Sequence, residues 1–362
     1  MYNYNSENSE NLISNNNMNN YNSENLINSN NISNFCYKSF YRPAIFIGLL
    51  GVFLDSSSNV FAKLLTSFGY TVFQIMFISA ITMFLGCSAI LIKDKSLPFP
   101  HESRLDFLAW SIVSGIFSFI MIYLLYTAYI MLPFSEVVII SAFNPVFTII
   151  LSKQIIGDKI TRYKIIGCSL LVISILISFN PINLYKLNFK DTSLWFGRML
   201  AFIAVLFDSL SMICYKYLIN NKTHYASQGW WQALIMIIIS PIAFYLAPIK
   251  IMKNYMDILY MLGIGFCTFI YVLTNGYILN YETALMTTIV NGSNIIFGLI
   301  WQSTIFNTPV EWYQYVAILI VLISLFVTAI EKTDQKKQSL SDQTEQLLSD
   351  QDKRSLSYQL MT

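Results

Sequence analysis

The sequence predicts an all-α membrane protein with ten transmembrane helices, arranged as two inverted five-helix repeats. Hydrophobic residues make up 55% of the chain and charged residues 12%, which is far from the composition of a soluble globular protein. The apolar residues gather in stretches of about 20, the length that crosses a hydrocarbon core as a helix. In addition, one polar pattern occurs in two of these stretches, one in each half of the chain.

The repeated pattern is Asp-Ser-x-Ser-x4-Lys. It occurs in FLDSSSNVFAKLL, where it runs from Asp55 to Lys63, and in LFDSLSMICYKYL, where it runs from Asp208 to Lys216. A carboxylate inside a membrane-length segment is costly unless it faces a partner or a water-filled cavity. Matching carboxylates in two halves therefore predict a polar pathway between duplicated units.

Each apolar stretch is expected to be a helix, because lipid offers no hydrogen-bond partners to an exposed strand. The ten expected helices are 43–62, 71–92, 107–130, 134–153, 162–180, 195–218, 228–248, 257–279, 283–303 and 310–330. Five helices per half is an odd number, so the second unit must cross the membrane in the opposite sense to the first. The expected repeats are therefore residues 43–180 and 195–331.

Polar segments flank the two repeats. Residues 1–42 are rich in Asn and Ser, and residues 332–362 are also polar, so both are expected to be disordered tails. Lys and Arg gather on the loops that face the cytosol if the N-terminus is inside. We therefore expect an integral, multi-pass protein with both termini cytosolic. The plasma membrane and internal membranes are equally compatible with this pattern.

The two carboxylates inside the apolar stretches are the first candidates for a binding site. Asp55 and Asp208 lie near the middle of their helices, and acids at that depth mark pathways for solutes or protons. Asn59 and Lys63 follow Asp55 at steps of four residues, so the three form one polar stripe. The alternative is that each Asp bonds nearby hydroxyls and only fixes helix packing.

Amides and tyrosines complete the predicted substrate-binding set. An amide in lipid needs a partner and offers both donors and acceptors to a polar solute. A tyrosine offers an aromatic wall with a hydroxyl, although ordinary packing would also explain it. The predicted substrate-binding residues are Asp55, Asn59, Tyr123, Tyr126, Asn144, Asp208, Tyr271, Asn275, Asn291 and Asn294. Pro145 is expected to interrupt the fourth helix.

Four charged residues near helix ends are candidates for gating or coupling. Lys63 and Lys216 lie where a long side chain can reach the interface, so a topological role is as well supported as a gating role. Glu136 and Glu282 are expected to be equivalent residues of the two repeats. Both lie near helix starts, where complementarity to the helix dipole explains an acid as well as gating does.

Enzymatic, metal and cofactor chemistry lack their usual motifs. Four of the five cysteines lie within apolar stretches, and none forms a CxxC pair, so neither a disulfide framework nor a zinc site is expected. The sequence has no HExxH, no GxSxG and no GxxxxGK[ST]. We expect no enzyme, no metal and no cofactor.

The residues resemble the drug/metabolite transporter superfamily with EamA-type units, including solute carriers of the 35 type. The segment SSSNVFAK, residues 56–63, carries the pattern that ends the first helix in that family. The segment SEVVIISAFNPVFTIILSKQIIGDKIT, residues 135–161, carries the fourth-helix signature. The resemblance covers about residues 43–331, and an Arg often found in the second helix falls here on Ser79.

The resemblance implies a secondary transporter that works by alternating access. Its expected partners are the lipid bilayer and a small-molecule metabolite, with a nucleotide sugar or related solute as the family-level expectation, moved with protons or by exchange. Nucleic acid is not an expected partner, and both a monomer and a homodimer fit the sequence. The alternative is a multi-pass receptor or scaffold with a transporter-like fold that transports nothing.

Overall fold

The computed structural model describes residues 43–99, 105–157, 161–178, 192–243, 249–252, 254–307 and 311–327. Apart from Pro43, the first residue of α2, these belong to one compact unit, Ala44–Thr362. The two predicted tails, 1–42 and 332–362, lie outside the described residues.

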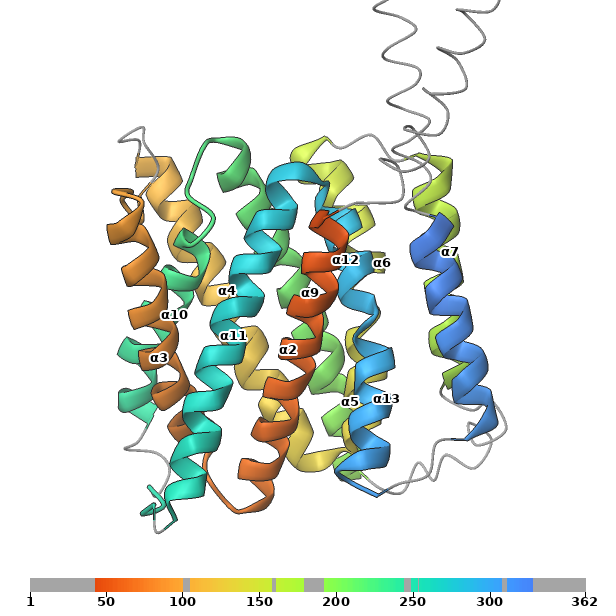
Figure 1. The fold of residues 1–362 in the computed structure, drawn as a ribbon, viewed down its shortest axis with the longest axis horizontal. Coiled ribbons are helices and arrows are strands. Elements are labelled where there is room, and N and C mark those ends of the chain that lie inside the picture. The colour runs from red at the N-terminus through yellow and green to blue at the C-terminus, as the bar shows by residue number, and fades with distance from the viewer. Residues whose placement is uncertain are drawn as a thin grey trace, which may run out of the picture. The chain divides into compact units, whose positions relative to one another are not determined.

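All regular structure in the described ranges is helical, and its order is the same in both halves (Figure 1). The first half contains α2 (Pro43–Ser67), α3 (Val72–Lys93), α4 (Leu105–Met131), α5 (Phe134–Ser141), α6 (Asn144–Leu151), a π-helix η1 (Ser152–Ile156) and α7 (Arg162–Ser178). The second half contains α9 (Thr192–Asn220), α10 (Ser227–Ala243), α11 (Tyr255–Tyr281), α12 (Ala284–Gly292), α13 (Asn294–Thr304) and a helix Trp312–Val327.

Six segments of the described chain are long and apolar enough to cross a membrane. They are Val72–Lys93, Asp106–Met131, Phe134–Ile156, Ser193–Asn220, Tyr255–Tyr281 and Ala284–Thr304. The helix Trp312–Val327 is apolar but shorter. The ten-span topology goes beyond these six segments and stays a prediction.

The fourth helix is interrupted in both halves, whereas the sequence predicted an interruption only at Pro145. In the first half, α5 ends at Ser141 and α6 begins at Asn144, with Pro145 in the first turn, where its missing N–H is tolerated. In the second half, α12 ends at Gly292 without any proline. There the Ser293 hydroxyl donates to the carbonyl of Val290, a local bond that competes with continued helix. An asparagine follows each interruption.

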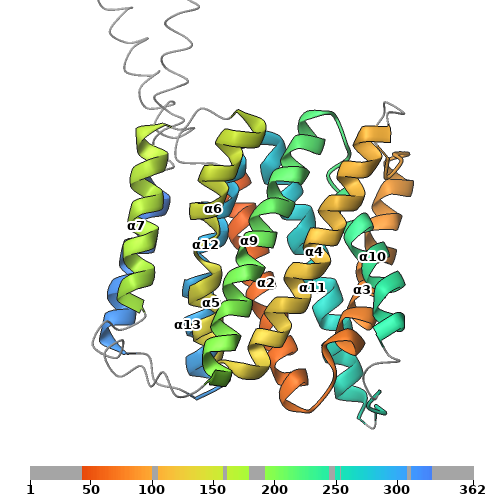
Figure 2. The same ribbon diagram turned by 180° about the vertical axis from the view of Figure 1, so that it is seen from behind.

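Helices of the two halves pack against each other rather than forming separate bodies. Contacts join α4 to α9, α3 to α10 and α11, and α6 to α9 and α12. The helix Trp312–Val327 lies beside α7 in both ribbon views (Figure 1, Figure 2). Hydroxyls join this pair: Ser174 donates to the carbonyl of Ala317 at 3.0 Å, and Ser324 donates to that of Gly167 at 2.7 Å.

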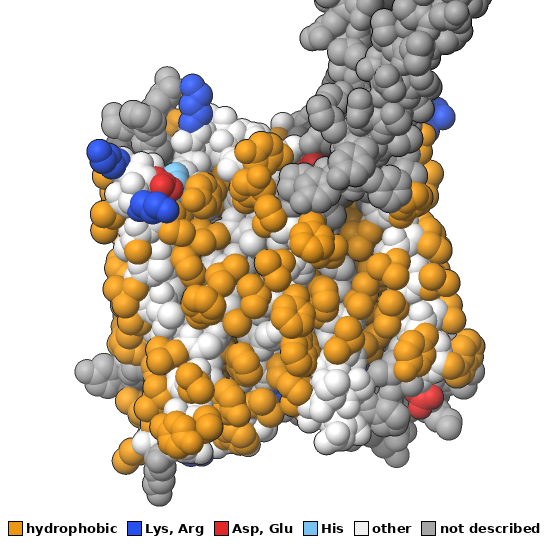
Figure 3. All heavy atoms as spheres, in the orientation of Figure 1, with side chains coloured by type: hydrophobic (Ala, Val, Ile, Leu, Met, Phe, Trp, Pro, Cys, Tyr) orange, Lys and Arg blue, Asp and Glu red, His pale blue; other side chains and the backbone are white. Residues whose placement is uncertain are grey.

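The face drawn in Figure 3 is covered largely by hydrophobic side chains, with the visible charged side chains near its edges. Large apolar side chains such as Leu85, Ile92 and Trp312 are mostly exposed. An apolar surface of this extent is unusual on a soluble monomer and suits contact with lipid. The chain is an integral, multi-pass membrane protein.

Candidate functional site

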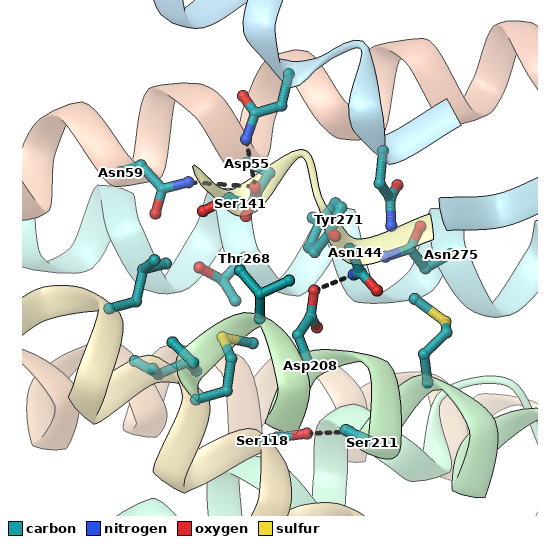
Figure 4. A pocket seen from close by; sticks show the side chains of 18 of the residues that line it. Asp55, Asn59, Ser118, Ser141, Asn144, Asp208, Ser211, Thr268, Tyr271 and Asn275 are labelled. Atoms are coloured by element: carbon teal, nitrogen blue, oxygen red, sulfur yellow. Dashed lines mark hydrogen bonds between the residues drawn. The ribbon is translucent and has the colours of Figure 1, made fainter. Parts of the chain in front are cut away.

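A cavity of about 110 Å³ lies among helices of both halves (Figure 4). Its walls come from α2, α4, α5 and α6 of the first half and from α9 to α13 of the second. A space of this size can hold several water molecules or a small solute. The helix interruptions lie at this cavity, since Asn144 and Asn294 both line it.

Two carboxylate–amide pairs cross between the halves at this cavity. Asp208 on α9 accepts a hydrogen bond from the amide of Asn144, the first residue of α6 (Figure 4). Asp55 on α2 accepts one from the amide of Asn294, the first residue of α13, at 3.4 Å. Each pair joins one half to the other. In the first pair the second half supplies the carboxylate, and in the second pair the first half does. A pseudo-two-fold axis between inverted repeats, the arrangement predicted from the sequence, would produce such a pair of contacts.

The first pair is the more extensively bonded. The side-chain oxygen of Asn144 accepts from the hydroxyl of Ser209 at 2.6 Å and from that of Thr148 at 3.0 Å. At the second pair, Asp55 accepts a further bond from Asn59 at 3.2 Å. The side-chain oxygen of Asn294 is buried and has no hydrogen-bond partner among the described residues. The duplicated sites are therefore related in position but not in bonding.

Lys63 and Lys216 lie outside the cavity lining and tie helices within their own half. The ammonium group of Lys63 donates to the carbonyls of Tyr129 and Leu132, at the end of α4. That of Lys216 donates to the carbonyls of Leu279 and Glu282, at the end of α11. A cation there compensates the unpaired carbonyls and the negative end of the helix dipole.

These contacts correct one equivalence drawn from the sequence. Lys63 reaches Leu132 and Lys216 reaches Glu282, so Glu282 corresponds to Leu132, at an offset of 282 − 132 = 150. The same offset relates the first residues of α6 and α13, 294 − 144 = 150. Glu136 and Glu282 are therefore not equivalent. The sequence comparison matched like residues, whereas the helix ends show the true register.

Glu136 and Glu282 also lie outside the cavity lining. The carboxylate of Glu136, on α5, forms an ion pair with Arg198 on α9, which crosses between the halves. The guanidinium of Arg198 also lies 5.3 Å from the ring centre of Trp195. Glu282 is the C-cap of α11, and its backbone N–H donates to the carbonyl of Ile278 at 2.8 Å.

Nine of the ten predicted substrate-binding residues line the cavity: Asp55, Asn59, Tyr126, Asn144, Asp208, Tyr271, Asn275, Asn291 and Asn294. Tyr123 is not among the residues that line the cavity, so its place in the substrate-binding set stays a prediction. Its ring stacks on Phe73, with ring centres 4.8 Å apart. Neighbouring tyrosines on one helix face different ways, and residue type alone does not tell which face meets the cavity.

Two hydroxyls and one amide at the cavity form a cluster that the sequence does not predict. The hydroxyls of Ser118 on α4 and Ser211 on α9 are 2.7 Å apart (Figure 4), and the amide of Gln228 donates to Ser211 at 3.2 Å. All three line the cavity. Ser211 belongs to the repeated Asp-Ser-x-Ser pattern, where only the Asp was singled out. The helical spacing of Ser114 and Ser118 within an apolar stretch was the other available signal.

The amide of Asn291 lacks the partners that a buried amide normally has. Both of its side-chain polar atoms are buried without a hydrogen-bond partner among the described residues, yet the residue lines the cavity. Buried polar groups are nearly always bonded, so each exception requires an explanation. A solute or a water in the cavity would supply the missing partner.

Among the residues that the structure describes, the cavity lining carries two carboxylates and no Lys, Arg or His. Ser79, where the resemblance led us to look for an Arg, donates its hydroxyl to the carbonyl of Met76 at 3.1 Å. In the described part of the chain, no group of three or more His, Cys, Asp or Glu is placed to hold a metal ion. The fixed charge at the site is therefore negative when the carboxylates are ionised.

Comparisons with known proteins agree with the duplicated fold. The model of the EamA-like transporter family matches residues 42–180 and again residues 195–330. No curated protein matches the chain. A crystal structure described only as that of a protein is similar to it, with a TM-score of 0.63 and 11% identity. That likeness covers 79% of this chain and 96% of the other, and at such low identity it shows the fold alone.

Proposed function

Because the chain belongs to the EamA-like transporter family, we propose that it is a secondary transporter that carries a small polar metabolite through the cavity between its halves. The observation that carries this proposal is the pair of reciprocal contacts, Asp55 with Asn294 and Asp208 with Asn144. Solute sites of inverted-repeat carriers lie at the repeat interface, where interrupted helices supply polar groups.

The contacts separate into those within a half and those between halves. Lys63 and Lys216 each hold helices within their own half. The Asp–Asn pairs and the ion pair of Glu136 with Arg198 cross between the halves. In alternating access, the crossing contacts are the ones that change when the halves rock around the solute. Glu136 is thus the better gating candidate.

We extend this proposal to topology. Ten spans in two inverted repeats, 43–180 and 195–331, place both termini in the cytosol by the distribution of Lys and Arg. The helical segments of the described residues occur in the order that this topology requires. A protease-accessible tag on either terminus would test it, since access from the lumen or exterior would contradict it.

The cavity argues for a small solute. Its volume of about 110 Å³ is below the range of roughly 300–1,000 Å³ typical of sites for drug-sized ligands. A nucleotide sugar carries phosphates that need cations, and the described residues of the lining offer none. The family-level expectation of a nucleotide sugar therefore gains no support from this site. The carboxylates could also carry a coupling proton, so proton coupling and exchange both remain part of the proposal.

Counterflow into proteoliposomes tests the proposal. Proteoliposomes that contain the purified chain are preloaded in turn with amines, amino acids, neutral polyols and sugar phosphates. They should accumulate the labelled form of at least one of these solutes. Asp208→Asn should abolish that accumulation, while Asp106→Asn, at an exposed position in the first turn of α4, should not. Equal counterflow by both variants would show that the solute does not use this cavity. Binding of a solute without any counterflow would favour the receptor alternative.

A further inference from the structure

The charge of the cavity identifies a class of solute. Asp55 and Asp208 line it together, and no basic side chain of the described residues does. The amides of Asn59, Asn144 and Asn294 bond these carboxylates but carry no charge to neutralise them. Two ionised carboxylates in one cavity attract a cation and repel an anion.

The orientation of the two carboxylates leaves one acceptor open on each. The hydrogen bonds from Asn59 and Asn294 both go to Oδ2 of Asp55, and that from Asn144 goes to Oδ2 of Asp208. Within the described residues, no protein group donates a hydrogen bond to Oδ1 of Asp55 or of Asp208. Neither oxygen is among the fully buried atoms without a partner, so both are accessible. Both oxygens can therefore accept a donor that enters the cavity.

The other walls suit an organic cation better than a bare metal ion. The rings of Tyr126 and Tyr271 line the cavity beside apolar side chains such as Met121, Val205 and Val272. An aromatic face attracts an ammonium group, and apolar walls suit the carbon atoms attached to it. In the described chain no cluster of three metal-ligating side chains is present to replace the hydration shell of a metal ion.

Asn291 supplies a second, uncharged contact. Its amide offers both donors and an acceptor, and none of its polar atoms has a protein partner in the described residues. A hydroxyl or carbonyl on the solute would satisfy it. We propose that the cavity binds a small organic ammonium ion, held by Asp55 and Asp208, with a hydroxyl or carbonyl group that bonds Asn291. This inference rests on the proposed function, because it names the solute of the same site.

Binding to the purified full-length chain tests the inference with two matched pairs of probes. Ethanolamine carries an ammonium group with N–H donors and a hydroxyl, and its neutral carbon isostere is 1-propanol. Choline carries a quaternary ammonium without N–H donors and a hydroxyl, and its neutral carbon isostere is 3,3-dimethyl-1-butanol. Calorimetry should show each cation binding at least tenfold more tightly than its isostere, the effect expected of one contact between opposite charges of about 1.4 kcal/mol or more. Equal affinity for choline and its isostere would overturn the inference, as would tighter binding of glucose phosphate.

Variants separate a binding role from a folding role. Asp55→Asn and Asp208→Asn should each weaken choline at least tenfold, whereas Asp55→Glu, which keeps the charge, should lose less. Asp106→Asn is the matched control and should bind as the unmodified chain does. If Asp55→Asn does not fold, the affinities of Asp55→Glu and Asn291→Ala still show whether these residues bind the solute. Unchanged affinity in Asn291→Ala would refute the proposed contact between the solute and Asn291. Unchanged affinity in Asp208→Asn would overturn the whole proposal.

Failure of this inference can be told from failure of the carrier proposal. Choline that binds through the carboxylates but shows no counterflow would contradict transport and leave the solute class standing. Counterflow of a neutral or anionic solute that depends on Asp208, without ammonium binding, would do the reverse. Binding of Na⁺ alone, not displaced by choline, would identify the carboxylates as a coupling-ion site and would also overturn the inference.

Discussion

Removal of the Asn144 amide should destabilise the protein far more than removal of the equivalent Asn294 amide. Asn144 is 3% exposed and makes three side-chain bonds: it donates to Asp208 and accepts from Ser209 and Thr148. Asn294 makes one, to Asp55 at 3.4 Å, while its own oxygen is unpartnered among the described residues. Truncation of the Asn144 side chain thus also leaves buried groups of Asp208, Ser209 and Thr148 without this partner.

The magnitude follows from these bonds. A bond to a charged group contributes about 1.5–3 kcal/mol and a neutral side-chain bond within a membrane about 0.6 kcal/mol. Asn144→Ala should therefore lower the free energy of unfolding by about 3 kcal/mol. Asn294→Ala loses one long bond and removes an unpartnered oxygen, so it should cost about 1 kcal/mol. The expected difference is about 2 kcal/mol between residues related by the pseudo-symmetry.

Reversible unfolding in mixed micelles measures both values. A double-mutant cycle between Asn144 and Asp208 should show coupling of at least about 1 kcal/mol, because the two side chains are in direct contact. Equal losses in Asn144→Ala and Asn294→Ala would refute the reasoning from the bond pattern. Additive effects of Asn144→Ala and Asp208→Ala would show that the crossing pair contributes nothing.

Two further predictions follow from other contacts. Lys63→Met and Lys216→Met should each lower the free energy of unfolding by about 1–2 kcal/mol, since helix-end carbonyls lose a cation, yet should leave solute affinity within about threefold; a large loss of affinity without destabilisation would contradict the helix-end role. A Cβ at Gly265 would clash with the carbonyl oxygen of Ser79, so Gly265→Leu should force α3 and α11 apart and lower the unfolding temperature by several degrees. An unchanged unfolding temperature would show that the helices do not meet there.

The sequence predicted much of the site because the lipid environment makes polar residues conspicuous. Asp55, Asp208 and the amides stand out in apolar stretches, and each lines the cavity. Tyr123 did not follow, because tyrosine is common in this chain and tolerates ordinary packing. Ser118 and Ser211 escaped notice because a serine can satisfy itself within a helix, so its presence in an apolar stretch carries little cost.

The partners of the carboxylates could not be predicted from the sequence. Asn144 and Asp208 are 64 residues apart, and Asp55 and Asn294 are 239 apart, so no local pattern links them. The second helix interruption was missed for a different reason. Pro145 predicts the first interruption, because proline is unfavourable within a helix. Gly292 and Ser293 only weaken a helix, so packing around the cavity decides whether that helix is interrupted.

The central claim, that one cavity between the halves opens to either side of the membrane, is tested most directly by thiol accessibility. Thr268 lines the cavity from α11, and Thr268→Cys can be placed in a chain whose five native cysteines are replaced. A membrane-impermeant thiol reagent should label this cysteine from both sides of oriented vesicles. Addition of solute should raise the labelling rate from one side and lower the labelling rate from the other. Labelling from one side only, under every condition, would contradict the account.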